Sequence, residues 1–195
     1  TGFETNTAFH PNWGQTCPVE NPNFTLAPNG VTCLCPNAAV GEIGTLTING
    51  EEKTFTKRTR AQLDTLIAND QNDPQIALTC TSGITNMQDL FNGDTTFNQD
   101  LSAWDVSNVT NMRRMFIGSA FNQDITHWDV SNVTNMNQMF RNTPFNQAIG
   151  VWDVSSVTNM QMMFRGTPFN QSIGNWDVSN VTTMREMFLQ AHNFN

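Results

Sequence analysis

Four tryptophans, Trp104, Trp128, Trp152 and Trp176, recur in the second half of the chain at a spacing of 24 residues. Each opens the word Trp-Asp-Val-Ser-x-Val-Thr-x-Met, which is followed by Met-Phe, and Phe-Asn-Gln recurs with the same period. A degenerate copy precedes them at Ile84-Thr85-Asn86-Met87. A unit of this length is too short to bury its own core, so we expect the units to stack on one another.

The apolar pattern inside one unit predicts its secondary structure. Val133, Met136, Met139 and Phe140 follow the i, i+3, i+6, i+7 spacing of one face of a short helix. Residues 125–130 place Trp and Val on alternate positions, which predicts a short strand. We therefore predict an α/β repeat solenoid with a short strand and a short helix in each 24-residue turn.

Three regions follow from the changes in composition. Residues 1–40 are rich in Pro, Asn and Gly and are expected to form an irregular, disulfide-stapled arm. In residues 41–80, two β-prone runs meet at Asn49-Gly50, which predicts a hairpin, and Thr59-Arg60-Ala61-Gln62 predicts a capping box at the start of a helix. We expect hairpin and helix to cap residues 81–195, a solenoid of about four to five repeats with an incomplete last one.

The composition points outside the cytoplasm. A net charge of −8 with nine Lys and Arg argues against nucleic acid and anionic lipid as partners. No apolar run of about 18 residues occurs, so we expect no membrane span. The four cysteines lie in the first 80 residues, without a Cys-x-x-Cys pattern, and favour two disulfides in an oxidising compartment. Three connectivities are open, although Cys33 and Cys35 are too close for unstrained pairing.

The repeated word Phe-Asn-Gln-Asp-Ile…Trp-Asp-Val-Ser-Asn-Val-Thr-Asn-Met…Met-Phe resembles the repeat of BspA-like bacterial surface proteins, which are relatives of the leucine-rich repeats. The likeness covers about residues 80–195. The lead-in is also similar at residues 29–36 and 79–84. The resemblance implies a leucine-rich-repeat-like coil, export to the cell surface, a role in adhesion or surface interaction, and no catalytic residues.

The same resemblance implies how the cysteines pair. Cys35 and Cys80 sit where the family lead-in has its cysteines, which implies the disulfide Cys35–Cys80 and hence Cys17–Cys33. Cys17 and Cys33 depart from the usual lead-in.

Two further ladders of residues have a structural and a functional interpretation. One Asp follows each repeated Trp, and a row of carboxylates could bind Ca²⁺. One carboxylate per turn is too few for such a site, so we expect each Asp to accept backbone hydrogen bonds at a corner and predict no metal. The aromatic residues and methionines are interpreted as stacked core rather than as an exposed strip for sugar stacking.

The polar columns of the repeat are the candidate ligand face. Their members are Asn108, Asn132 and Asn180 with Thr110, Thr134, Thr158 and Thr182. Stacked amides can bond along the repeat, which is the interpretation we favour, or a flat Thr/Asn face can recognise a glycan or even ice. Asn23 heads an Asn-x-Thr glycosylation acceptor, and Thr65 and Thr95 lie in Asp-Thr words that resemble a bacterial O-glycosylation acceptor.

Signs of catalysis are missing from the sequence. The three histidines are isolated, and no phosphate-binding glycine loop, His-Glu-x-x-His motif or nucleophile elbow occurs. We expect a protein that is not an enzyme and needs no cofactor.

Two functions therefore compete. One is a monomeric adhesin module that binds a glycan or protein through the polar face. The other is a secreted filament subunit that assembles head to tail, because residues 192–195 begin the next repeat word and no capping unit follows. A longer natural chain would equally explain that end.

The filament hypothesis names a contact. Residues 5–13, with Phe9 and Trp13, loosely echo residues 142–152. We expect this arm of one copy to dock on the last repeat of the next, near Phe188 and Phe194, and such an open interface builds fibres. Deleting residues 1–16 should then leave a folded monomer.

Overall fold

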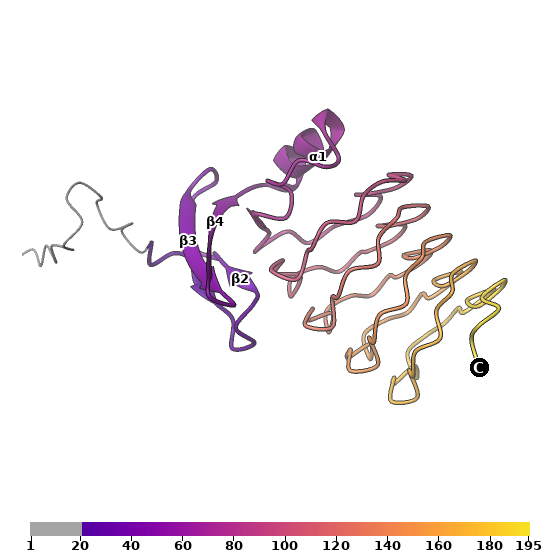
Figure 1. The fold of residues 1–195 in the computed structure, drawn as a ribbon. Coiled ribbons are helices and arrows are strands. Elements are labelled where there is room, and N and C mark those ends of the chain that lie inside the picture. The colour runs from indigo at the N-terminus through magenta and orange to yellow at the C-terminus, as the bar shows by residue number, and fades with distance from the viewer. Residues whose placement is uncertain (1–20) are drawn as a thin grey trace, which may run out of the picture.

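The computed structural model describes residues 21–195. Two small sheets and one helix lie in residues 21–80, and the remaining chain forms a row of elongated units lying side by side (Figure 1). The strands are β1 (Thr25–Leu26), β2 (Cys33–Leu34), β3 (Ile43–Ile48), β4 (Glu51–Lys57) and β5 (Thr79–Cys80). One sheet pairs β1 with β2 antiparallel; the other has the order β3-β4-β5, with β4 and β5 parallel.

The predicted hairpin is confirmed as β3 and β4, which pair antiparallel from Ile48–Glu51 outwards. Its two-residue turn places Asn49 at φ 53° and Gly50 at φ 82°, the left-handed region that Asn and Gly enter most easily. Gly44 in β3 is required for packing, because a Cβ there would lie 2.2 Å from Cγ of Phe24. The hairpin is thus fixed by its turn and by one close contact.

The predicted capping box is also confirmed, at the start of α1 (Arg60–Asn69). The Thr59 hydroxyl accepts from the Gln62 amide, and the Gln62 side chain accepts from the Thr59 amide, so two free backbone donors are satisfied. Leu63 is fully buried, and Leu66 and Ile67 pack against the same core. This apolar face holds α1 against the first unit of the repeat region.

The predicted α/β leucine-rich-repeat-like solenoid is wrong. Residues 81–195 contain neither the short helix nor the short strand that it requires in each turn. Their only β pairing is a row of isolated parallel bridges, which joins Asn86, Asn111, Asn135, Asn159 and Thr183 in that order. The domain limits at residues 40 and 80 remain a prediction.

The reason lies in where the backbone amides donate. The amides of Met136, Gln138 and Phe140 donate to carbonyls of the next unit, at 2.9–3.1 Å. The intervening amides of Met139 and Arg141 donate to carbonyls three residues earlier in their own unit, at 3.2 and 3.3 Å. An α-helix needs every amide for its own i−4 carbonyl, so this alternation excludes one.

Residues with positive φ make this alternation of backbone hydrogen bonds possible. Arg114, Gln138, Met162 and Glu186 occupy equivalent positions and have φ between 54° and 57°. A non-glycine residue in this region costs about 1–3 kcal/mol, which the surrounding contacts must offset. The predicted strand is also replaced by turns, since the Trp128 amide donates to Ile125 O and the Val133 amide to Val130 O.

The predicted aromatic core is confirmed. Phe91, Phe116, Phe140, Phe164 and Phe188 form a stacked column with centroids 5.5–5.9 Å apart. Within a unit, the next Phe stacks against this column, as in the Phe140–Phe145 pair at 3.9 Å. The repeated tryptophans are buried, and each indole donates to a backbone carbonyl, such as Leu101 O for Trp128. The 24-residue period therefore builds one continuous core.

Candidate interaction surfaces

The threonine column is exposed and lies along the bridges between units. Each Thr amide donates to the preceding Thr carbonyl, as from Thr134 to Thr110 O at 2.9 Å. The Thr134 hydroxyl donates to that same oxygen at 3.1 Å, and Thr110, Thr158 and Thr182 repeat the arrangement. The hydroxyl protons are thus bonded within the repeat region, while the threonine side chains remain exposed.

Side chains of the neighbouring asparagine column also donate hydrogen bonds to the preceding unit. The side-chain amides of Asn132 and Asn180 donate to Ser107 O and Ser155 O of the preceding unit, at 2.8 and 2.7 Å. The exposed Asn108 amide reaches only the hydroxyl of its neighbour Ser107, at 3.4 Å. Bonds between units therefore occupy most of the donors that the sequence assigned to a ligand face.

Sequence reasoning missed a second asparagine ladder, in the Phe-Asn-Gln words. The side-chain oxygens of Asn98, Asn122 and Asn146 each accept the backbone amide of the equivalent Asn in the next unit, at 2.9 Å. The following Gln donates back, as from Gln147 to Asn122 O at 2.7 Å. The strict repetition of two amide residues after Phe was the sign that could have revealed this ladder.

The Asp residues make tight corners. Asp129 accepts the amide and hydroxyl of Ser131, at 3.1 and 2.6 Å, and Asp105 binds Ser107 in the same way. The hydroxyl and then the amide of Ser155 hold the pKa of Asp153 below its usual range. Within residues 21–195, no cluster of three or more His, Cys, Asp or Glu could hold a metal ion.

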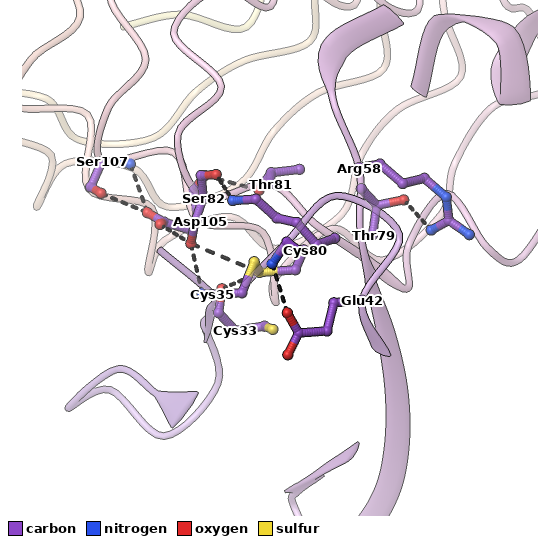
Figure 2. The surroundings of a disulfide bond; sticks show 12 residues. Cys33, Cys35, Glu42, Arg58, Thr79, Cys80, Thr81, Ser82, Asp105 and Ser107 are labelled. Carbon is purple, nitrogen blue, oxygen red and sulfur yellow. Dashed lines mark hydrogen bonds between the residues drawn. A yellow bond between two sulfur atoms is a disulfide. The ribbon is translucent and has the colours of Figure 1, made fainter. Parts of the chain in front are cut away.

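Asp105 differs from its equivalents because it is buried at the junction with the N-terminal sheets. Its side chain accepts the Ser82 hydroxyl at 2.5 Å, and its backbone carbonyl accepts the Thr81 hydroxyl at 2.9 Å (Figure 2). Ser82 in turn accepts the Cys35 amide, and its carbonyl accepts the Lys57 ammonium. These bonds tie the first unit to the sheet.

A disulfide joins Cys35 to Cys80 at the same junction (Figure 2). The buried Cys33 has no disulfide partner among the described residues, and its expected partner Cys17 lies outside them. Burial first, and the nearby Asp105 carboxylate second, raise the pKa of the Cys33 thiol to about 12. As long as this thiol stays buried, it is protonated and unreactive at neutral pH.

The fifth unit, residues 181–195, leaves apolar groups exposed that other units cover. Met184 is 41% exposed and Val178, just before the unit, 39%, whereas the equivalent Met160 and Val154 are 0% and 1% exposed. Phe188 stacks on Phe194 at 3.8 Å, and both are only partly buried. We call Val178, Met184, Phe188 and Phe194, with the outward backbone of this unit, the open edge.

The opposite end of the row is closed. In later units the equivalent carbonyls of Asn111 and Arg113 accept amides from the preceding unit. In the first unit, Asn86 O and Gln88 O instead accept the guanidinium of Arg60 on α1, at 2.6 and 2.8 Å. Arg60 thus takes the place of a preceding unit.

The other predicted site residues do not gather into one site. Asn23 donates to the Glu42 carboxylate at 2.8 Å, the exposed Thr65 donates to Ala61 O inside α1, and Thr95 is exposed. Phe9 and Trp13 lie outside the described residues. An open hollow of about 570 Å³ lies beside α1, lined by Asp64, Asp70, Asp94 and neighbouring residues. Within residues 21–195 no helix has the length and apolar character to cross a membrane.

A comparison with protein families matches the family described as "Mycoplasma protein of unknown function, DUF285" at residues 62–166 and 120–195. Together the two matches span more than half of the chain. No curated protein and no solved structure matches the chain significantly.

Proposed function

The chain belongs to the DUF285 family, and from this premise we propose that it is a secreted structural and interaction protein of a cell surface, without catalytic activity. The resemblance of its repeat word to BspA-like surface proteins supports the finer assignment. The Cys35–Cys80 disulfide supports an extracellular location, because disulfides persist in oxidising compartments.

The open edge is the observation that carries the proposal. Met184 and Val178 expose side chains whose equivalents are buried by the next unit. Full burial of an apolar side chain of this size contributes about 1.5–3 kcal/mol, and covering Met184 and Val178, which are 41% and 39% exposed, contributes the corresponding fraction of that. We propose that a further repeat unit covers this edge, and that copies of the protein assemble where a second copy supplies that unit.

The test compares native mass across two matched variants. Met184→Lys places a charge on the open edge, whereas Val151→Lys places the same charge on an exposed apolar residue away from it (75% exposed). Light scattering should find assemblies for the wild type and Val151→Lys, and particles near 21.8 kDa for Met184→Lys. A wild type that stays monomeric at every concentration would contradict the proposal.

A monomeric adhesin is the second candidate, and the exposed threonine column favours it. The exposed side chains of Thr110, Thr134, Thr158 and Thr182 repeat at the spacing of the units, which suits an extended ligand such as a glycan chain. This function predicts saturable glycan or protein binding by monomers that is weakened by Thr134→Val. Unchanged binding by that variant would exclude this face.

A further inference from the structure

Three asparagines in the chain are each followed by glycine, a pair of residues that can react spontaneously. The pairs are Asn29-Gly30, Asn49-Gly50 and Asn92-Gly93. The backbone nitrogen of the glycine can attack Cγ of the asparagine, because glycine has no side chain to hinder the approach. All three glycines have positive φ and open space where a Cβ would lie. The glycines therefore do not distinguish the pairs, and the hydrogen bonds around each pair must do so.

Hydrogen bonds hold both reacting groups of the first pair. The side-chain oxygen of Asn29 accepts the amides of Val31 and Thr32, both at 3.0 Å. Its side-chain nitrogen donates to the Thr32 hydroxyl at 2.9 Å. The attacking nitrogen of Gly30 donates to Ala27 O at 2.9 Å. These bonds must open before the Gly30 nitrogen can reach Cγ of Asn29.

The repeat region holds the third pair. The side-chain nitrogen of Asn92 donates to the Asp89 carboxylate at 3.1 Å. The Gly93 amide donates to Ile117 O of the next unit at 2.8 Å. Attack by this nitrogen would therefore break one of the bonds that join the first two units.

The second pair forms the turn that joins β3 to β4 (Figure 1). Asn49 and Gly50 are both exposed. Within residues 21–195, neither the Asn49 side chain nor the Gly50 amide forms a hydrogen bond. The strand pairing ends at Ile48 and Glu51, outside the two turn residues. Both reacting groups of this pair are thus accessible to water and held by no hydrogen bond from the described residues.

We infer that Asn49 is a site of spontaneous deamidation, for which water is the only co-reactant. The Gly50 nitrogen loses its proton and bonds to Cγ of Asn49, the bond from Cγ to Nδ2 breaks, and ammonia leaves with that proton. Water then opens the succinimide ring and returns a proton to the Gly50 nitrogen. If the bond to Cγ breaks, the product is aspartate; if the bond to the main-chain carbonyl breaks, it is isoaspartate. This inference is independent of the proposed function.

The reaction would change the turn in two ways. Each conversion adds a negative charge beside the exposed carboxylates of Glu51 and Glu52, and like charges repel one another. Isoaspartate also lengthens the backbone of a turn that has only two residues between the paired Ile48 and Glu51. A two-residue turn sets the register of its hairpin, so we expect the modified hairpin to be less stable.

The test incubates folded protein at pH 8 and follows each asparagine by peptide mapping and mass spectrometry, with a urea-unfolded sample beside it. Each hydrogen bond that must open first slows ring closure by about two- to tenfold. In the folded protein, Asn49 should therefore convert about fourfold or more faster than Asn92, and about tenfold or more faster than Asn29. In urea the three should convert at similar rates, because the protecting bonds are lost.

Asn49→Gln is the matched control, because glutamine must close a larger ring and reacts far more slowly. The backbone tolerates this residue, since Gln138 adopts φ 57° and Asn49 has φ 53°. The folded wild type should accumulate a more acidic species on ion exchange, and Asn49→Gln should not. Equal accumulation in both proteins, conversion of Asn49 only in urea, or faster conversion of Asn29 or Asn92 in the folded protein would each overturn the inference.

Discussion

Removing one rung of the Phe-Asn-Gln ladder should destabilise the protein in a way that depends on position. Asn122→Ala deletes the oxygen that accepts the Asn146 amide at 2.9 Å and the Gln147 side chain at 3.0 Å. Gln147 keeps its second bond, to Asn122 O. The main cost is therefore the half-buried Asn146 amide left without an acceptor.

The unsatisfied Asn146 amide sets the size of the expected loss of stability. An unsatisfied backbone amide costs about 1–3 kcal/mol when fully buried, and partial access to water reduces this to about 1–2 kcal/mol for Asn146. For a chain of this length, such a loss lowers the melting temperature by about 2–8 °C. Urea titration followed by tryptophan fluorescence measures the free energy directly.

Asn170→Ala is the matched control. Asn170 ends the same ladder, and its side chain accepts no hydrogen bond from the described residues, although its own amide donates to Asn146. We expect its loss to remain below about 0.5 kcal/mol, as for an ordinary surface substitution. Equal losses in the two variants would refute the ladder as a source of stability.

Three further predictions concern the junction and the Asp corners. Replacing Cys35 and Cys80 by Ala opens a cross-link across a sequence separation of 45 residues, and chain entropy predicts a loss of about 4 kcal/mol in urea titration; a loss below 1 kcal/mol would contradict this. The pKa of Asp153 is lowered in the folded state, and the amide and hydroxyl of Ser179 lower that of Asp177. The stability that these two carboxylates contribute is therefore present above their unfolded pKa of about 3.9 and is lost as pH falls through their lower folded pKa. Melting temperatures should therefore fall below about pH 4, and less so in Asp153→Asn/Asp177→Asn; an identical fall in both proteins would refute this. In a Cys17→Ser variant, which leaves Cys33 as a thiol, a pKa of about 12 should make Cys33 resist maleimide at pH 8 until urea unfolds the chain, as mapped by mass spectrometry, and rapid native labelling would contradict its burial.

The period of the repeat predicted which residues are buried but not the backbone that buries them. Val133, Met136, Met139 and Phe140 are all buried, as a helix face would be. The same spacing also fits a run of turns in which every second backbone amide donates to a carbonyl of the next unit. The residue that permits these turns is Gln138, Arg114 or Met162, and none of these residue types marks a left-handed position in a sequence.

Local motifs were more predictable than contacts between distant residues. Asn49-Gly50 and the Thr59–Gln62 capping box specify their geometry within four residues, and both are present. Arg60 has no such signature, because its partners Asn86 O and Gln88 O lie 26 and 28 residues away. Its role in closing one end of the row follows only from the fold.

Amide hydrogen exchange at the open edge tests the central claim most directly. The amides of Met160 and Phe164 are bonded to the fifth unit and should be protected at every protein concentration. The equivalent amides of Met184 and Phe188 should exchange freely in dilute protein and become protected as concentration rises. If Met184 and Phe188 stay unprotected in concentrated protein while Met160 and Phe164 remain protected, the open edge is not a site of assembly.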